Sequence, residues 1–279
     1  MLDPNQTDKK ACSSPNDYFD SVVALDLTTG AVKWATRALA YDAWNVACIF
    51  VPQGVGNCPN PEGPDFDFGG SGPNLLSAGG VDVLGIGEKS GMYWALNPDN
   101  GNVIWSTLVG PGSSLGGIEW GTAFDGQRIY VPISNLYGIP YALQPSGSLV
   151  NGGSWAALNP ANGKILWQTA VPGSCSPPIA SVAQGCMGLG PARVGNGVVF
   201  VGSMDTNPAN PTMFALDAAT GNVLWSHAAG SSVIAGPAIV GDTIYWGSGY
   251  GRFGPQLGTG NNKLFAFSVG GQDLVTAGQ

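Results

Sequence analysis

Apolar and polar residues alternate with a period of two in short runs along most of the chain, a pattern typical of half-buried β-strands. The pattern is clearest in four segments that align with one another. Each has an apolar strand ending in Ala-Leu-Asp or Ala-Leu-Asn, a turn that closes on glycine, and a second strand that carries a tryptophan. They begin at Val22, Tyr93, Trp155 and Met213. These segments predict four β-hairpins whose turn glycines adopt positive φ.

The tryptophans of the second strands are Trp34, Trp105, Trp167 and Trp225, with separations of 71, 62 and 58 residues. Common propeller repeats are shorter, about 40–50 residues, so the surplus must lie in loops. A further apolar strand precedes each later hairpin, so each unit has at least three strands. These strands are expected over residues 81–87, 127–134 and 197–203, and a last pair over 242–248 and 263–269, which keeps the alanine and lacks the glycine and tryptophan.

The repeated unit is typical of a propeller blade. We predict an all-β fold, a partial β-propeller of about four to five blades of a larger ring, over residues 18–270. Residues 1–17 are expected to be a disordered or linker segment, and residues 271–279 a C-terminal tail. Because a blade cannot bury both faces alone, we expect the four tryptophans to fill the gaps between neighbouring blades and to be structural.

The composition agrees with this fold and excludes other classes of protein. With 44 glycines and 21 prolines among 279 residues many tight turns are expected, and a charged fraction of 10% argues against surface helices. A net charge of −8 with ten scattered basic residues argues against nucleic-acid binding. No apolar run approaches the length of a transmembrane helix. The first seventeen residues lack the apolar core of a secretory signal.

The five cysteines lie in Gly/Pro/Asn-rich stretches. Cys48 with Cys58, and Cys175 with Cys186, would each close a short loop, which leaves Cys12 unpaired and implies an oxidising compartment. Spacing alone does not establish connectivity, so five free thiols is the other interpretation. The lack of a C-x-x-C pair and the presence of a single histidine argue against metal ligation by these cysteines.

The motif Ala-Leu-Asp-x-x-Thr-Gly-x-x-x-Trp resembles the tryptophan-docking repeat of quinoprotein alcohol dehydrogenases, which use pyrroloquinoline quinone (PQQ). From residue 18 to residue 269 the chain is similar to the polyvinyl-alcohol dehydrogenase branch of that family. The segments that carry the resemblance include YDAWNVAC, PDFDFGGSGPNLL, GEKSGMYWALNPDNG, GGIEWGTAFDGQRIYVPISN and WGSGYGRFG. The resemblance implies eight blades around PQQ and a calcium ion, with this chain as a C-terminal part. Missing N-terminal blades or another chain would close the ring.

The resemblance also implies candidate site residues. Asp65 in PDFDFGG is the expected catalytic base and calcium ligand, with Asp67 second. A rival alignment gives the role to Asp42 or Asn45 in YDAWN, because residues 46–64 look like an insertion. Any one of these residues could instead be a turn cap or a solvated loop residue.

Three further residues are expected at the cofactor. Lys89 in GEKSG matches the position where the family presents a Lys or Arg. Trp120 matches a tryptophan beside the quinone and would form an apolar wall. Glu119 stands where the family carries asparagine, a departure that puts this polar contact in question.

The implied function is PQQ-dependent oxidation of secondary or polymeric alcohols, with electrons passed to a cytochrome c or another external acceptor. The family works outside the cytoplasm, so the resemblance implies a periplasmic or secreted protein. The alternatives are a non-catalytic propeller scaffold for protein–protein interaction and an inactive truncated dehydrogenase fragment. The segments PDFDFGG and GEKSG favour the dehydrogenase, because a scaffold has no need of them.

Overall fold

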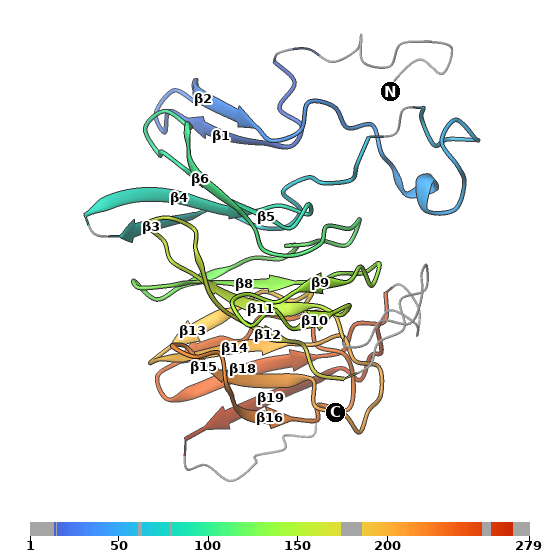
Figure 1. The fold of residues 1–279 in the computed structure, drawn as a ribbon, viewed down its shortest axis with the longest axis vertical. Helices are drawn as coiled ribbons and strands as arrows, with labels where there is room; N and C mark the ends of the chain where they lie inside the picture. The colour runs from blue at the N-terminus through green and yellow to red at the C-terminus, as the bar shows by residue number, and fades with distance from the viewer. Residues whose placement is uncertain are drawn as a thin grey trace.

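The computed structural model describes residues 14, 16–60, 63–78, 80–173, 186–252 and 258–269. In this part of the chain the regular structure is almost entirely β, and the single helix is a 3-10 turn over Val46–Ile49. The strands form successive antiparallel sheets that follow one another in chain order, from β1 and β2 at one end to β17–β19 at the other (Figure 1).

Three of the sheets are complete four-stranded units in which neighbouring strands run antiparallel. The first has strands β3 (Asn74–Ala78), β4 (Val81–Gly87), β5 (Met92–Leu96) and β6 (Val103–Leu108), paired in that order. The second has β7 (Ala123–Phe124), β8 (Ile129–Ile133), β11 (Ser154–Leu158) and β12 (Ile165–Ala170). The third has β13 (Arg193–Gly195), β14 (Val198–Gly202), β15 (Met213–Asp217) and β16 (Val223–His227). Such sheets are propeller blades, which confirms the predicted fold class.

In the described part of the chain, the sheets at the two ends of the array have fewer than four strands. The first has β1 (Ser21–Leu25) and β2 (Val32–Arg37), and the last has β17 (Ala238–Val240), β18 (Thr243–Ser248) and β19 (Lys263–Ser268). A small hairpin of β9 (Tyr141–Ala142) and β10 (Leu149–Val150) lies within the connection from β8 to β11. The four predicted hairpins are therefore present, and the first strand of each later sheet is the element that the sequence pattern did not predict.

The repeated tryptophans join neighbouring blades, as expected. The indole N–H of Trp34 donates to the carbonyl of Pro98 in the next blade at 3.0 Å, and Trp105 binds Pro160 at the same distance. Trp167 binds the carbonyl of Ala218 at 3.1 Å. The threonine two residues after each tryptophan donates to the carbonyl of the next turn glycine, in the pairs Thr36–Gly101, Thr107–Gly163 and Thr169–Gly221.

The two ends of the blades differ. At one end the strands are joined by tight turns such as 97–102 and 159–164, which lie on the left in Figure 1. At the other end they are joined by longer loops such as 38–73 and 109–122, and by the turn 88–91. Because antiparallel meanders alternate their connections between the two ends, every predicted site residue lies at the loop-bearing end.

One of the two predicted cysteine pairs is confirmed in the described part of the chain. Cys48 and Cys58 form a disulfide that closes the loop around the 3-10 turn. Cys186 is also disulfide-bonded, whereas Cys12 and Cys175 lie outside the described residues. The predicted tail 271–279 and most of segment 1–17 lie outside them as well.

No helix among the described residues has the length and hydropathy needed to cross a membrane.

Candidate functional site

Lys89 is the centre of a group of charged side chains at the loop-bearing end. Its ammonium group lies 3.4 Å from the carboxylate of Asp65 and 3.2 Å from that of Asp67. The Lys89 and Asp65 side chains are 12% and 9% exposed, whereas that of Asp67 is 41% exposed. The structure thus brings together three residues that the sequence analysis selected from two separate motifs.

The Lys89 backbone fixes the position of the side chain. Its N–H donates to the carbonyl of Asp67 at 2.9 Å, and its carbonyl accepts from the N–H groups of Ser113 and Gly117. These bonds connect the turn 88–91 to the loops 38–73 and 109–122. Gly91 has φ +86° and sits so close to the Gly110 carbonyl that any side chain there would collide with it. A rigid turn therefore holds the ammonium group.

Burial and charge tune the protonation of this group. Burial raises the pKa of Asp65 to about 6, although the neighbouring Lys89 charge opposes the shift. Burial alone would lower the pKa of Lys89, but the carboxylates of Glu119, Asp65 and Asp67 raise it above its usual value. Lys89 is therefore a fixed positive charge at neutral pH, and Asp65 is a carboxylate that can gain a proton close to neutral pH.

Glu119 and Trp120 lie on the loop 109–122. Glu119 is 7% exposed, and its Oε2 atom has no hydrogen-bond partner among the described residues. Burial raises the pKa of Glu119 to about 7, with Lys89 opposing the shift. Gly69 has φ +51° and leaves space for this carboxyl group. The Trp120 ring packs over Gly70, where a Cβ would overlap it, and Trp120 remains 42% exposed.

Asp42 and Asn45 differ in their surroundings. The Asp42 carboxylate accepts the N–H of Trp44 at 2.7 Å, and burial and the Asp67 charge raise its pKa, which places it beside the central group. Asn45 caps the 3-10 turn through the N–H of Ala47 and donates to the Asn57 carbonyl. Both ends of the Asn45 amide are therefore engaged within the disulfide loop.

Sequence reasoning missed two buried acids near the same group. Glu88 is 2% exposed and accepts hydrogen bonds at 2.7 Å from both Ser90 and Trp94. Asp20, directly before β1, has φ +44°, and burial together with the charge of Glu88 raises its pKa to about 7. Glu88 is adjacent to Lys89 in the GEKSG motif, and this pair of opposite charges could have indicated that Glu88 belongs to the site. Asp20 gave no signal, because only the fold brings β1 to this group.

The described residues fit the two implied cofactors unequally. The buried cation Lys89, the Asp65 carboxylate, the partly exposed Trp120 ring and the unpartnered Oε2 of Glu119 have the chemistry that one edge of a planar quinone requires. For calcium, no three Asp, Glu, His or Cys side chains within the described ranges are arranged to hold a metal ion, and Asp65 is paired with Lys89 instead. The residues present therefore do not fit a calcium site by themselves.

The fold and the repeated tryptophan contacts define a PQQ-type β-propeller. A family model described as outer membrane protein assembly factor BamB matches residues 89–254, more than half of the chain, and the chain belongs to this family. Among curated proteins it is similar to the polyvinylalcohol dehydrogenase of Sphingopyxis sp. (strain 113P3), with 35% identity over 92% of this chain. It is also similar to that of Pseudomonas sp, with 32% identity over 91% of this chain.

Solved structures show the same fold. The quinohemoprotein alcohol dehydrogenase of Comamonas testosteroni matches with a TM-score of 0.61 and 19% identity, over 94% of this chain and 44% of that one. BamB from Moraxella catarrhalis matches with a TM-score of 0.51 and 16% identity, over 91% of this chain and 54% of that one. The chain spans only 41% and 40% of the two curated dehydrogenases.

Proposed function

We propose that the chain is a catalytic part of a PQQ-dependent alcohol dehydrogenase that oxidises secondary or polymeric alcohols. The observation that carries the proposal is the buried pair of Asp65 and Lys89, 3.4 Å apart at the loop-bearing end of the blades. The similarity to two polyvinylalcohol dehydrogenases supports it. The blades that complete the ring would come from the rest of a longer protein or from another chain.

In this proposal Asp65 acts as the base on the substrate hydroxyl. Its carboxylate takes the hydroxyl proton. Lys89 would place a fixed positive charge beside the quinone oxygen on which negative charge develops. A bound quinone supplies the acceptor for the hydride that leaves the alcohol carbon. Trp120 would cover one side of the site, and Glu119 would offer its unpartnered oxygen to the cofactor.

The electrons would pass to a cytochrome c or another external acceptor. The disulfide between Cys48 and Cys58 supports an oxidising compartment, and therefore a periplasmic or secreted location.

Binding and activity test the proposal separately. We expect PQQ to bind the chain in calorimetric titration and Lys89→Ala to weaken that binding at least tenfold. In the polypeptide with a completed ring, we expect Asp65→Asn to lower dye-linked alcohol oxidation by about 10²–10⁴-fold, the usual contribution of a general base. The matched control is Asp82→Asn, at an exposed position of β4. Full activity of Asp65→Asn would remove the assignment of the base.

A non-catalytic scaffold is the second candidate. It is favoured by the family model described as an assembly factor, which matches residues 89–254 and so leaves out the loop with Asp65. In that case PQQ would not bind, and Lys89→Ala would change only stability.

A further inference from the structure

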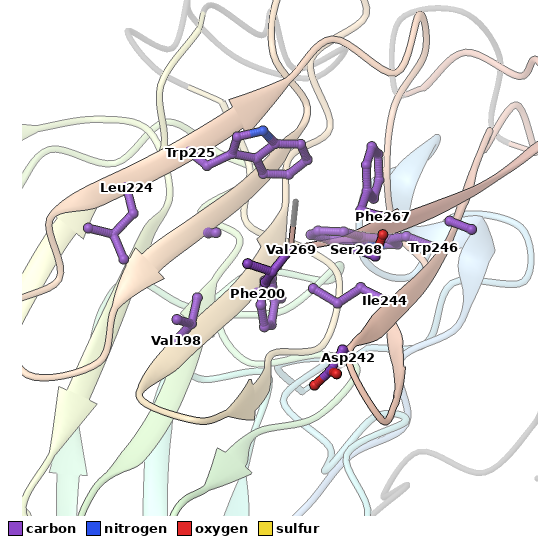
Figure 2. Close-up of a pocket in the computed structure, with 12 residues that line it drawn as sticks. Val198, Phe200, Leu224, Trp225, Asp242, Ile244, Trp246, Phe267, Ser268 and Val269 are labelled. Carbon is purple, nitrogen blue, oxygen red and sulfur yellow. The ribbon is translucent and has the colours of Figure 1, made fainter. Parts of the chain in front are cut away.

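Glu88 is a charged side chain enclosed in the first complete blade, and it is only 2% exposed. The last interface between described blades is different. An apolar cavity of about 360 Å³ lies there, and Figure 2 shows Trp225, Ile244 and Phe267 in its lining. Asp242 is the one charged residue among the described residues that line it, and Asp242 is exposed. Because burial of an acid opposes folding unless its oxygens are hydrogen-bonded, the partners of Glu88 indicate what it does.

The later described blades have no equivalent of Glu88 and of Trp94, the tryptophan that binds it. The strand pairing of β4 with β5 is repeated in the later sheets, so equivalent positions can be read from the register. The residues in the place of Glu88 are Ile133, Ser203 and Ser248, and those in the place of Trp94 are Ala156, Phe214 and Phe265. These residues cannot form a hydrogen bond between a carboxylate and an indole. The first complete blade therefore departs from the repeat at two linked positions, and it is the blade that carries Lys89.

The Glu88 carboxylate connects the turn 88–91 to strand β5. Its Oε2 atom accepts hydrogen bonds at 2.7 Å from the Ser90 hydroxyl and from the Trp94 indole N–H. The Ser90 hydroxyl in turn accepts the N–H of Met92 at 3.1 Å. Trp94 packs against the apolar cluster between β1 and the first complete blade. The carboxylate therefore ties the turn to a ring that the core already holds.

Lys89 lies inside this turn. Its ammonium group is 3.4 Å from the Asp65 carboxylate and 3.2 Å from that of Asp67. Lysine carries its charge on a flexible four-carbon stem, so the direction of the ammonium group depends on the backbone beneath it. The loop 109–122 holds that backbone from one side, because an N–H of this loop donates to the Glu88 carbonyl at 3.1 Å. The Glu88 side chain holds it from within the blade.

We propose that Glu88 is a positioning residue for Lys89. Through Ser90 and Trp94 the carboxylate holds the turn in the conformation that presents the ammonium group to Asp65. The catalytic consequence rests on the proposed function, in which a cation fixed in advance stabilises the negative charge that develops on the quinone. Glu88 touches neither substrate nor cofactor in this proposal, so its replacement should act only through the position of Lys89.

Acetylation of lysines by acetic anhydride, followed residue by residue with mass spectrometry, reports the position of Lys89 in the full chain without a cofactor. The Lys89 side chain is 12% exposed, whereas Lys33 and Lys164 are exposed and serve as internal standards. We expect Glu88→Ala to raise the rate at Lys89 about tenfold relative to the standards, because both hydrogen bonds of the carboxylate are lost. Glu88→Gln keeps an oxygen that can accept both bonds and should restore a rate close to that of the wild type. Ser203→Ala, at the equivalent position of the third complete blade, is the matched control and should leave the rate unchanged.

Trp94→Phe removes one of the two bonds and keeps an aromatic ring, so it provides a second variant if Glu88→Ala fails to fold. It should also raise the rate at Lys89, by about threefold. A merely structural Glu88 would lower Tm in these variants and leave the Lys89 rate at its wild-type value, which would overturn the proposal. Acetylation of Lys89 as fast in Glu88→Gln as in Glu88→Ala would also overturn it.

PQQ titration separates this role from the proposed function. If the wild-type chain binds PQQ, Glu88→Ala should weaken binding about as much as Lys89→Ala does, and unchanged binding would overturn the positioning role. If the wild-type chain does not bind PQQ, the proposed function fails, and the acetylation rates alone decide the role of Glu88.

Discussion

The acids around Lys89 are the most informative feature at the scale of single residues. Asp20 and Glu119 are both buried, and burial raises the pKa of each to about 7. With Asp65, whose pKa is raised to about 6, they are three buried acids of one charge cluster; Asp65 and Glu119 face Lys89, and Asp20 faces Glu88 and Asp67. Such a cluster is unfavourable for folding when all members are ionised, which is common at functional sites.

The protonation of Asp65 sets a pH dependence for the proposed reaction. A base must be deprotonated to act, and the pKa of Asp65 is raised to about 6. We therefore expect kcat/KM for alcohol oxidation to rise with pH, with its midpoint near pH 6 and its plateau above about pH 7. A rate that is flat between pH 5 and pH 7 would contradict Asp65 as the base.

Stability should have the opposite pH dependence. An acid whose pKa is higher in the folded state stabilises the fold while it is protonated, and that contribution is lost as pH rises through the folded pKa. For Asp20 and Glu119 the loss falls between about pH 4 and about pH 7. We expect Tm to drop by several degrees from pH 5 to pH 8, and Glu119→Gln to reduce the drop. A Tm that rises over this range would refute the expectation.

At the scale of elements, the turn glycines do two different things. Gly30 and Gly163 have nearly the same backbone, with φ of +71° and +70°. A Cβ at Gly30 would meet nothing within 4 Å, whereas one at Gly163 would overlap the Trp105 ring. The first glycine serves only the turn, and the second also receives the tryptophan of the preceding blade.

This difference makes a matched pair of variants. Gly30→Ala should cost about 1 kcal/mol, the backbone cost of a side chain at positive φ. Gly163→Ala should cost about 3 kcal/mol or more, because the docked indole must also move. Denaturant unfolding measures both, and equal losses would show that docking contributes little.

The disulfide between Cys48 and Cys58 is a second feature that stabilises the fold at the scale of elements. Cys48 and Cys58 enclose a separation of 10 residues, and closing a short loop in the unfolded chain stabilises a fold by about 2–3 kcal/mol. We expect the Cys48→Ala/Cys58→Ala double variant to lower the free energy of unfolding by that amount. If the loop unfolds locally, hydrogen exchange over residues 46–58 should rise without a global change.

At the scale of the whole molecule, the described blades form an array whose first and last sheets each have one face that no described blade covers. The last blade shows this most clearly. Leu264 of β19 is 64% exposed, whereas Tyr93, Trp155 and Met213 at the same position of the complete blades are at most 1% exposed. The position is core where another described blade follows and is exposed in the last described sheet, as expected for a repeat whose units bury one another.

The same substitution should therefore have different effects along the array. Leu264→Gln should change the free energy of unfolding by less than about 0.5 kcal/mol, as at other surface sites. Met213→Gln should cost about 3 kcal/mol, because it buries an amide without partners. A large loss for Leu264→Gln would mean that this face is covered in solution.

The sequence by itself determined the blades, their order and the docking tryptophans. The reason is local, since the period-two pattern, the turn glycine and the indole are all encoded within each repeat. It also identified the cysteine pair of the loop 38–73, and most of the acids around Lys89 through a family resemblance. The first strands of the later sheets escaped prediction. Three of them have only two or three residues, such as Ala123–Phe124, and strands that brief have no period to read.

Only the tertiary structure decided which side chains meet. Lys89 and Asp65 are 24 residues apart, and their contact exists because two loops leave neighbouring blades at the same end. Asp20 belongs to another blade and joins the group around Lys89 only in the folded chain, and no feature of the sequence indicated it. Asn45 instead caps the 3-10 turn. Contacts between repeats depend on stacking in three dimensions, which the pattern within one repeat does not encode.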